Sequence, residues 1–248
     1  MASYGFVLLS LAISFVTSCP PVKPPCICGS SEHGPVQIVC NRAKSMKEIT
    51  DALANATGAV IDRLVITNTP IRTLERRDLE PLTSLMLQRL ALVNNGIENV
   101  ASDAFTPVKS NLLALDLSDN GLTKIDASLL TGAEQLISFA AQGNRIALIE
   151  DRAFANMKSL CYIDLSFNRL STLPENLLSG SFKRAPGSAV PRMLYVCENS
   201  WKCDAKLEWF REYLRNNADI IVDKPGCLSL CDFGTYRLPI RDRDLTHN

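Results

Sequence analysis

The chain repeats one apolar pattern at a nearly constant spacing from residue 61 to residue 201. Each copy has apolar residues at its first, fourth, sixth and eleventh positions and Asn or Thr at its ninth. Complete copies span 61–71, 87–97, 112–122, 136–146 and 160–170, and a degenerate sixth copy spans 194–201. The ninth positions are therefore 26, 25, 24, 24 and 31 residues apart: Thr69, Asn95, Asn120, Asn144, Asn168 and Asn199. A unit of this length cannot bury its apolar face alone, so neighbouring copies must stack.

The start of each copy predicts a short strand with one buried face, because apolar residues such as Leu115 and Leu117 alternate with variable ones. The ninth residue comes where the chain must turn, and an Asn amide there can bond backbone groups that the turn leaves unpaired. We therefore expect an internal ladder that Thr69 interrupts at its first rung and that continues through Asn95, Asn120, Asn144 and Asn168. Apolar residues between the copies are expected to point inward from the opposite side: Leu74, Val100, Ile125, Ile149, Leu173, Leu79, Phe105, Leu130, Phe154 and Leu178.

This pattern resembles the leucine-rich-repeat superfamily. The resemblance implies an α/β fold, a right-handed solenoid with a parallel β-sheet on its concave face and irregular or short helical segments on its convex side. The alternative is a sandwich or barrel with accidental periodicity, which five near-complete copies argue against. We assign the repeats to residues 61–196.

The N-terminus predicts a signal peptide over residues 1–18. The apolar run from Phe6 to Val16 is too short to span a bilayer, and small residues precede Cys19. The same residues also resemble a bacterial lipoprotein cleavage box, but plain secretion is favoured because Cys19 has a structural partner to find. A second run of membrane length is absent from the sequence, and the C-terminus is polar, so we expect no membrane span.

Nine cysteines in a chain of this size favour disulfides and an extracellular setting. The spacing of Cys19, Cys26, Cys28 and Cys40 could also hold zinc, but the secretory context favours disulfides. The spacing resembles the N-terminal flank of extracellular leucine-rich-repeat proteins, which implies the pairs Cys19–Cys28 and Cys26–Cys40 in a cap over residues 19–60. That cap also holds one glycosylation sequon, at Asn55.

Residues 199–210 resemble the C-terminal flank of the same proteins, although Ser200 and Ala205 replace the usual Pro and second Cys. The family pattern implies Cys203–Cys227, and we expect Cys197 to replace the missing partner of Cys231, although pairing does not follow from sequence alone. The cap is assigned to residues 197–234 and a polar tail to residues 235–248. Cys161 is left unpaired, either as a buried thiol or as a link between two chains.

Variable strand residues point away from the interior, so the concave face is the expected binding surface. The first two repeats present arginines, the third and fifth present aspartates, and tyrosines lie near the last strands. A partner could use this charge gradient, with aromatic side chains as anchors. The alternative is a solvated sheet face without a ligand. The candidate partner-binding residues are Arg63, Arg89, Asp116, Gln142, Tyr162, Asp164 and Tyr195.

The sequence argues against catalysis and against nucleic-acid binding. Its 26 basic and 26 acidic residues balance, so it has no general attraction for polyanions. It has only two histidines, in the N-terminal flank and the tail, and no phosphate-binding glycine loop. Asp116 and Asp164 could form a carboxylate pair, but no neighbour that would raise either pKa is evident. We therefore expect no catalytic residue, metal or cofactor.

The resemblance implies a secreted, extracellular protein that binds another protein through its concave face. One alternative is a non-catalytic accessory subunit of a secreted enzyme, because the chain loosely resembles the leucine-rich chain that accompanies a shrimp luciferin monooxygenase. Another alternative is a matrix component that associates with itself, for example as a dimer. The fold alone does not choose among these roles.

Overall fold

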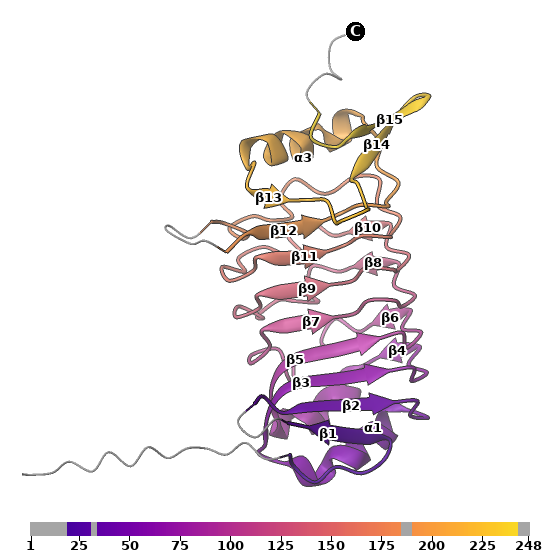
Figure 1. Ribbon diagram of the computed structural model, residues 1–248, viewed down its shortest axis with the longest axis vertical. Helices are drawn as coiled ribbons and strands as arrows, with labels where there is room; N and C mark the ends of the chain where they lie inside the picture. Colours follow the sequence, from indigo (N-terminus) through magenta and orange to yellow (C-terminus); the bar gives the residue numbers. More distant parts are fainter. Residues whose placement is uncertain (1–18, 31–33, 185–189, 243–248) are drawn as a thin grey trace, which may run out of the picture.

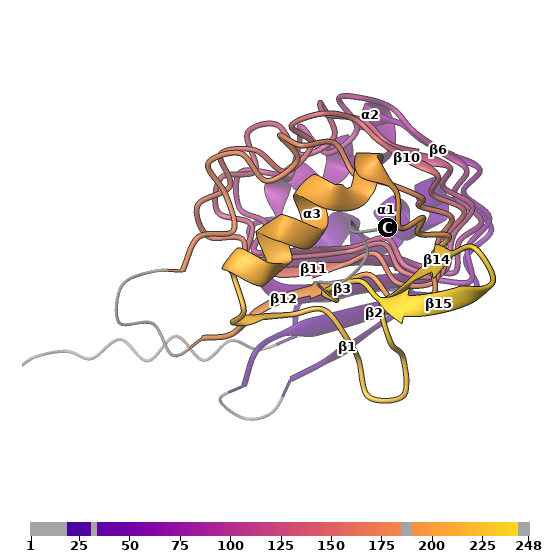
Figure 2. The same ribbon diagram turned by 90° about the horizontal axis from the view of Figure 1, so that it is seen from above.

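A computed structural model describes residues 19–30, 34–184 and 190–242. The expected signal peptide over 1–18 and both histidines lie outside these residues. The described chain winds into a stack of coils. The strands run across the long axis of the stack and succeed one another along it (Figure 1). The strands form one side of the stack, and turns, short strands and short helices form the other (Figure 2).

One nine-stranded sheet runs through the whole stack in the order β1-β2-β3-β5-β7-β9-β11-β12-β13. Only β1 is antiparallel to its neighbour, and the other neighbouring strands are parallel. The strands are β1 (Cys26–Gly29), β2 (Gln37–Asn41), β3 (Val60–Thr67), β5 (Met86–Val93), β7 (Ala114–Asp116), β9 (Ser138–Ala140), β11 (Tyr162–Asp164), β12 (Arg192–Tyr195) and β13 (Ile220–Ile221). The parallel sheet predicted from the repeats is confirmed, and cap strands extend it at both ends.

The opposite side of the stack is built from shorter elements. They are β4 (Thr73–Leu74) paired with β6 (Asn99–Val100), β8 (Lys124–Ile125) paired with β10 (Leu148–Ile149), helix α2 (Arg76–Leu79) and the 3₁₀ turn η2 (Glu80–Ser84). Nine of the ten apolar residues expected to point inward from this side are buried, and Val100 is half-buried. The core therefore fills the space between the sheet and this second side.

The predicted asparagine ladder is present. The side-chain amide of each ladder asparagine makes two bonds to the preceding coil. Its oxygen accepts from a backbone N–H there, and its nitrogen donates to the carbonyl at the end of that coil's strand. Asn144, for example, accepts from Leu122 N at 3.0 Å and donates to Leu117 O at 3.0 Å. Equivalent bonds are made by Asn95, Asn120, Asn168 and Asn199. The ladder satisfies backbone groups at each turn and ties every coil to the one before it.

The residue before each rung has a left-handed backbone conformation. Gly143 occupies this position once with φ of 66°, and the other coils place larger residues there. Their φ values lie between 51° and 56°: Asn68, Asn94, Asp119, Phe167 and Glu198. This region costs energy for most side chains, so the ladder bonds that follow must outweigh local strain.

The N-terminal cap closes the first coil. Helix α1 (Met46–Leu53) begins at Ser45, whose side chain accepts from Glu48 N at 3.3 Å, and the 3₁₀ turn η1 (Ala54–Ala56) follows it. The structure contains the disulfides Cys19–Cys28 and Cys26–Cys40, the pairing that the family resemblance implies. Because β2 also pairs with β3, the cap both covers the coil end and continues the sheet.

The C-terminal cap lays helix α3 (Ala205–Asn216) over the last coil (Figure 1). Asp204 begins the helix by accepting from Lys206 N at 3.0 Å, and Trp201 is buried beneath it. Strands β14 (Leu230–Phe233) and β15 (Tyr236–Pro239) then form an antiparallel pair, and Ile240 is 1 % exposed. The cap therefore extends beyond residue 234, where the sequence placed the start of a polar tail.

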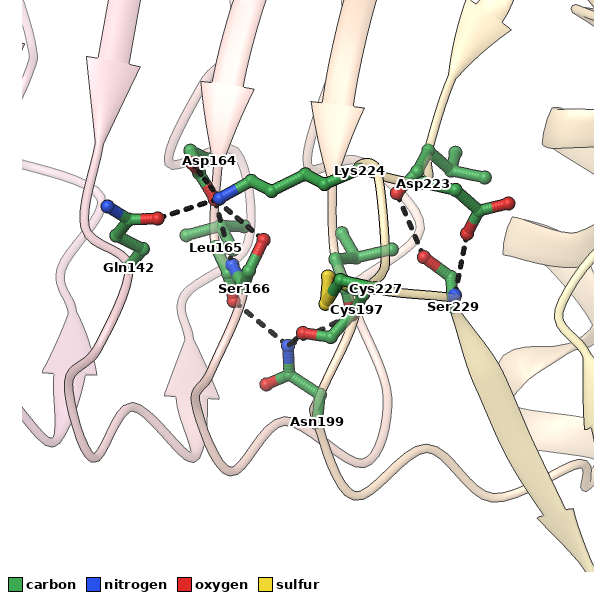
Figure 3. The surroundings of a disulfide bond; sticks show 12 residues. Gln142, Asp164, Leu165, Ser166, Cys197, Asn199, Asp223, Lys224, Cys227 and Ser229 are labelled. Atoms are coloured by element: carbon green, nitrogen blue, oxygen red, sulfur yellow. Dashed lines mark hydrogen bonds and ion pairs between the residues drawn. A yellow bond between two sulfur atoms is a disulfide. The ribbon is translucent and has the colours of Figure 1, made fainter.

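Both C-terminal disulfides differ from the expected pairing of Cys203 with Cys227 and Cys197 with Cys231. The structure joins Cys197 to Cys227 and Cys203 to Cys231, with Cα–Cα distances of 5.7 and 5.2 Å. The reason is the path of the chain after β13. Residues 222–229 turn back to the sheet and bring Cys227 to Cys197 (Figure 3). Strand β14 instead runs beside residues 201–203, where Cys203 N donates to Asp232 O at 3.0 Å.

Candidate functional site

The strand register arranges the candidate residues in two neighbouring rows on the concave face. The first row contains Arg63, Arg89, Ala114, Ser138, Tyr162 and Met193. The second contains Val65, Ala91, Asp116, Ala140, Asp164 and Tyr195. Gln142 lies just beyond the end of β9. All seven predicted residues thus belong to one surface, as strand alternation requires.

This surface has two different parts. Its middle is a hollow of about 360 Å³, which is lined by Arg63, Arg89, Leu90, Ala91, Ala114, Leu115, Asp116, Ser138, Ala140 and Tyr162. Four of the predicted residues line this hollow. The other three, Gln142, Asp164 and Tyr195, lie nearer the C-terminal cap and contact a side chain that the sequence analysis did not consider.

That side chain is Lys224, which the C-terminal cap places across the concave face (Figure 3). Its Nζ lies 2.5 Å from Asp164 Oδ2 and donates to Gln142 Oε1 at 2.7 Å. It also lies 5.3 Å from the centre of the Tyr195 ring, which allows a cation–π contact. The three residues nearest the cap are therefore engaged by the protein's own chain.

The loop that carries Lys224 is held in place by hydrogen bonds and a disulfide. Lys224 and Cys227 exchange backbone hydrogen bonds of 3.1 and 2.9 Å around Pro225 and Gly226. Proline sets the first central dihedral of such a turn, and Gly226 supplies the positive φ, 76°, of the second. The disulfide to Cys197 and the hydrogen bond from Ser229 N to Asp223 Oδ1 anchor the loop to the sheet and to itself (Figure 3).

Asp164 is the centre of a dense polar cluster, and its side chain is only 3 % exposed. It accepts from Ser166 N at 3.1 Å, from Ser166 Oγ at 2.7 Å and from Tyr162 Oη at 3.2 Å. Burial, and next the charge of Asp164, raise the pKa of Tyr162 well above its usual range. Tyr162 therefore stays neutral and donates its hydroxyl proton, while its ring meets Tyr195 edge-on at 5.7 Å.

Charges in the hollow are less well paired. Arg89 donates to Asp62 Oδ2 at 3.1 Å, and half of its side chain remains exposed. Within the described residues, Arg63 forms no ion pair. Asp116 accepts from its neighbour Ser118 N at 2.9 Å. The hollow thus presents a cationic wall, a floor of small residues and one carboxylate.

Sequence reasoning missed Lys224, although a signal was visible. The sequence Lys224-Pro225-Gly226 before Cys227 predicts a turn, but the direction of that turn depends on the disulfide partner.

Cys161, the unpaired cysteine, is half-buried, and burial raises the pKa of its thiol. Asn55 is exposed in η1.

Two other kinds of site are absent from the described residues. No cluster of three or more His, Cys, Asp or Glu side chains suited to a metal ion occurs there. None of the helices in those residues combines the length and apolar character needed to cross a membrane.

Comparisons with known proteins agree with the fold. A family model described as a leucine-rich repeat matches residues 141–181. Human vasorin is 30 % identical over 142 residues, which cover 56 % of this chain and 20 % of vasorin. Lumican of Gallus gallus is 36 % identical over 80 residues, or 32 % of this chain and 23 % of lumican. The chain therefore spans less than a quarter of these two relatives.

A solved structure of the Drosophila Toll–Spätzle complex contains a similar chain. The TM-score is 0.50 at 18 % sequence identity, covering 66 % of this chain and 23 % of that chain. At this identity the likeness bears on the fold alone, and it agrees with the stacked parallel strands and capped ends. The repeat pattern, the parallel sheet, the asparagine ladder and the relatives together identify the chain as a leucine-rich-repeat protein with a disulfide-bonded cap at each end.

Proposed function

We propose that this chain is a secreted binding protein that recognises another protein through its concave sheet face. The supporting observation is the hollow of about 360 Å³ in the middle of that face, with exposed charge on one wall and a floor of small residues. Solenoids commonly bind partners on extended concave surfaces. Four disulfides and the extracellular relatives fit a protein that works outside the cell.

Partner capture with two matched variants tests this proposal. Ala140 lies on the floor of the hollow, and Ala147 is exposed in the loop that precedes β10. Ala140→Arg would obstruct the hollow, whereas Ala147→Arg adds the same charge and bulk elsewhere. Wild-type protein and the Ala147→Arg variant should retain the same stoichiometric protein from the native extracellular fluid, and the Ala140→Arg variant should lose it.

The identity of the captured chain separates the possible roles. A receptor ectodomain supports recognition, and a secreted enzyme supports the accessory-subunit role. Sedimentation of the purified protein as a dimer, through a contact that Ala140→Arg leaves intact, supports self-association. Retention of the same partner by the Ala140→Arg variant, folded as judged by circular dichroism, would contradict binding through the hollow.

A further inference from the structure

Two arginines stand directly opposite each other at the edge of the hollow. Arg63 in β3 and Arg89 in β5 are register partners on adjacent parallel strands. Such strands lie about 4.8 Å apart, and like charges at opposed positions destabilise a sheet. Asp62 offsets the charge of Arg89 only in part, because half of that arginine side chain remains in solvent. The pair therefore favours an additional anion from outside the chain.

The hollow next to these arginines suits a side chain. Its floor consists of Ala91, Ala114, Ser138 and Ala140, none of which blocks entry with a long side chain. Its far wall is Tyr162, whose hydroxyl is held by Asp164. Beyond that wall, Lys224 already neutralises Asp164 and contacts Gln142 and Tyr195. Within the two described rows of strand residues, the cationic side chains are those of Arg63 and Arg89.

We propose that this hollow receives an acidic side chain from the partner protein, with its carboxylate held between the guanidinium groups of Arg63 and Arg89. The inference rests on the proposed function and adds the chemistry of the partner. Each guanidinium offers donors in a planar fork that matches a carboxylate, so one Glu or Asp can accept from both. The small floor residues then accommodate the backbone or aliphatic groups on either side of that residue.

A single acidic residue fits better than a dense polyanion. Asp116 faces the same hollow and would repel closely spaced phosphates or sulfates. The whole chain also has as many acidic as basic residues, 26 of each, so it lacks the general positive field that nucleic acid or sulfated glycan requires.

A random twelve-residue peptide library displayed on phage, selected against the full protein, tests the inference. Peptides that wild-type protein enriches should carry Glu or Asp flanked by small or aliphatic residues. The synthetic peptide from the strongest clone should lose about ten- to a hundredfold in affinity when its acidic residue is changed to the amide. The double variant Arg63→Gln/Arg89→Gln should bind both peptides equally weakly.

The matched control is Arg72→Gln/Arg76→Gln, because these two arginines are also exposed and each pairs with a glutamate away from the hollow. It should preserve the preference for the acidic peptide. Added salt should weaken wild-type binding of the acidic peptide more than binding of the amide peptide.

Failure of the acidic-side-chain inference can be told apart from failure of the proposed concave binding face. Enriched peptides without an acidic residue, whose binding is lost in the Ala140→Arg variant, would overturn this inference and leave the concave binding face in place. Enriched peptides that bind Ala140→Arg as tightly as wild type, or a library that yields none, would count against both proposals. Heparin retention that Arg63→Gln/Arg89→Gln abolishes would overturn the acidic-peptide assignment in favour of a sulfated glycan.

Discussion

At the scale of single residues, the asparagines of the ladder do more than fill a turn. The Asn120 amide donates to the carbonyls of Leu92, Leu117 and Ser118 at 2.7, 3.0 and 3.0 Å. Its Oδ1 accepts from Asn95 N and Ile97 N at 3.0 and 3.1 Å. Five backbone groups therefore depend on one side chain.

Asn120→Ala should destabilise the fold by about 2–4 kcal/mol, because it leaves several of these backbone groups unpaired. The neighbouring Asp119→Asn is the control, since Asp119 is exposed and Asn also tolerates its left-handed backbone. Urea unfolding followed by circular dichroism measures both. Equal losses for the two variants would contradict the role of the ladder.

Lys224 is a second single residue that we expect to stabilise the fold. Its side chain is 20 % exposed, and that of its partner Asp164 is 3 % exposed, so the pair is only partly screened by water. Lys224 also connects the C-terminal cap to the fourth and fifth complete repeats, through Gln142 and Asp164 respectively.

Lys224→Met should cost about 1–3 kcal/mol of unfolding free energy, because a buried carboxylate then loses its cation. Adding Asp164→Asn should recover part of that loss, and Lys202→Met, at an exposed lysine, should change little. Thermal denaturation of wild type, Lys224→Met, Asp164→Asn and the double variant gives the coupling. Additive losses in the double variant would show that the two groups do not stabilise each other.

At the scale of elements, Arg192 joins β12 to the C-terminal cap. The guanidinium is almost fully buried and binds both carboxylate oxygens of Asp219, at 2.6 and 3.0 Å, and Phe182 O at 2.6 Å. The hydrogen bond from Arg192 lowers the pKa of the Asp219 carboxyl below its ordinary value. A buried cation thereby holds together three segments that are separated in sequence.

This depressed pKa makes the contact dependent on pH. A carboxyl whose pKa is lower in the folded state stabilises the fold above the pKa of the unfolded chain, about 3.9 for Asp, and that contribution is lost as pH falls through the folded value. Asp219→Asn should therefore lower the melting temperature at pH 7, and the difference from wild type should shrink toward pH 3. The exposed pair partner Asp232 gives the control Asp232→Asn. A difference that stays constant with pH would rule out the charge as its cause.

At the scale of the whole molecule, the solenoid is quasi-one-dimensional. Each coil contacts its neighbours through the sheet and the ladder, and the two caps cover the apolar ends. Stability should therefore vary along the stack, and damage at one end should stay near that end.

Cys26→Ser/Cys40→Ser removes a disulfide that joins β1 to β2. Hydrogen exchange followed by mass spectrometry should show lost protection in β2 and β3, with β9 and β11 retaining theirs, because opening needs only local separation of coils. Cys161→Ser, which breaks no disulfide, should leave the whole profile unchanged. Uniform loss across all strands would indicate a single cooperative unit instead.

The sequence by itself determined the parts of this protein that repeat. Leu115 and Leu117 set the strand face, Asn120 and its equivalents set the turn, and Ser45 and Asp204 mark where the cap helices begin. These features depend on contacts within one coil or with the next, and the period carries that information.

Only the tertiary structure decided how the C-terminal cap meets the sheet. Cys227 pairs with Cys197, and Lys224 reaches Asp164 sixty residues earlier in the chain, because a tight turn folds back over the concave face. Both contacts join segments that share no period, so no local pattern reports them. The extent of free binding surface around Arg63 and Arg89 therefore follows from the path of the chain after β13, and this path depends on long-range packing.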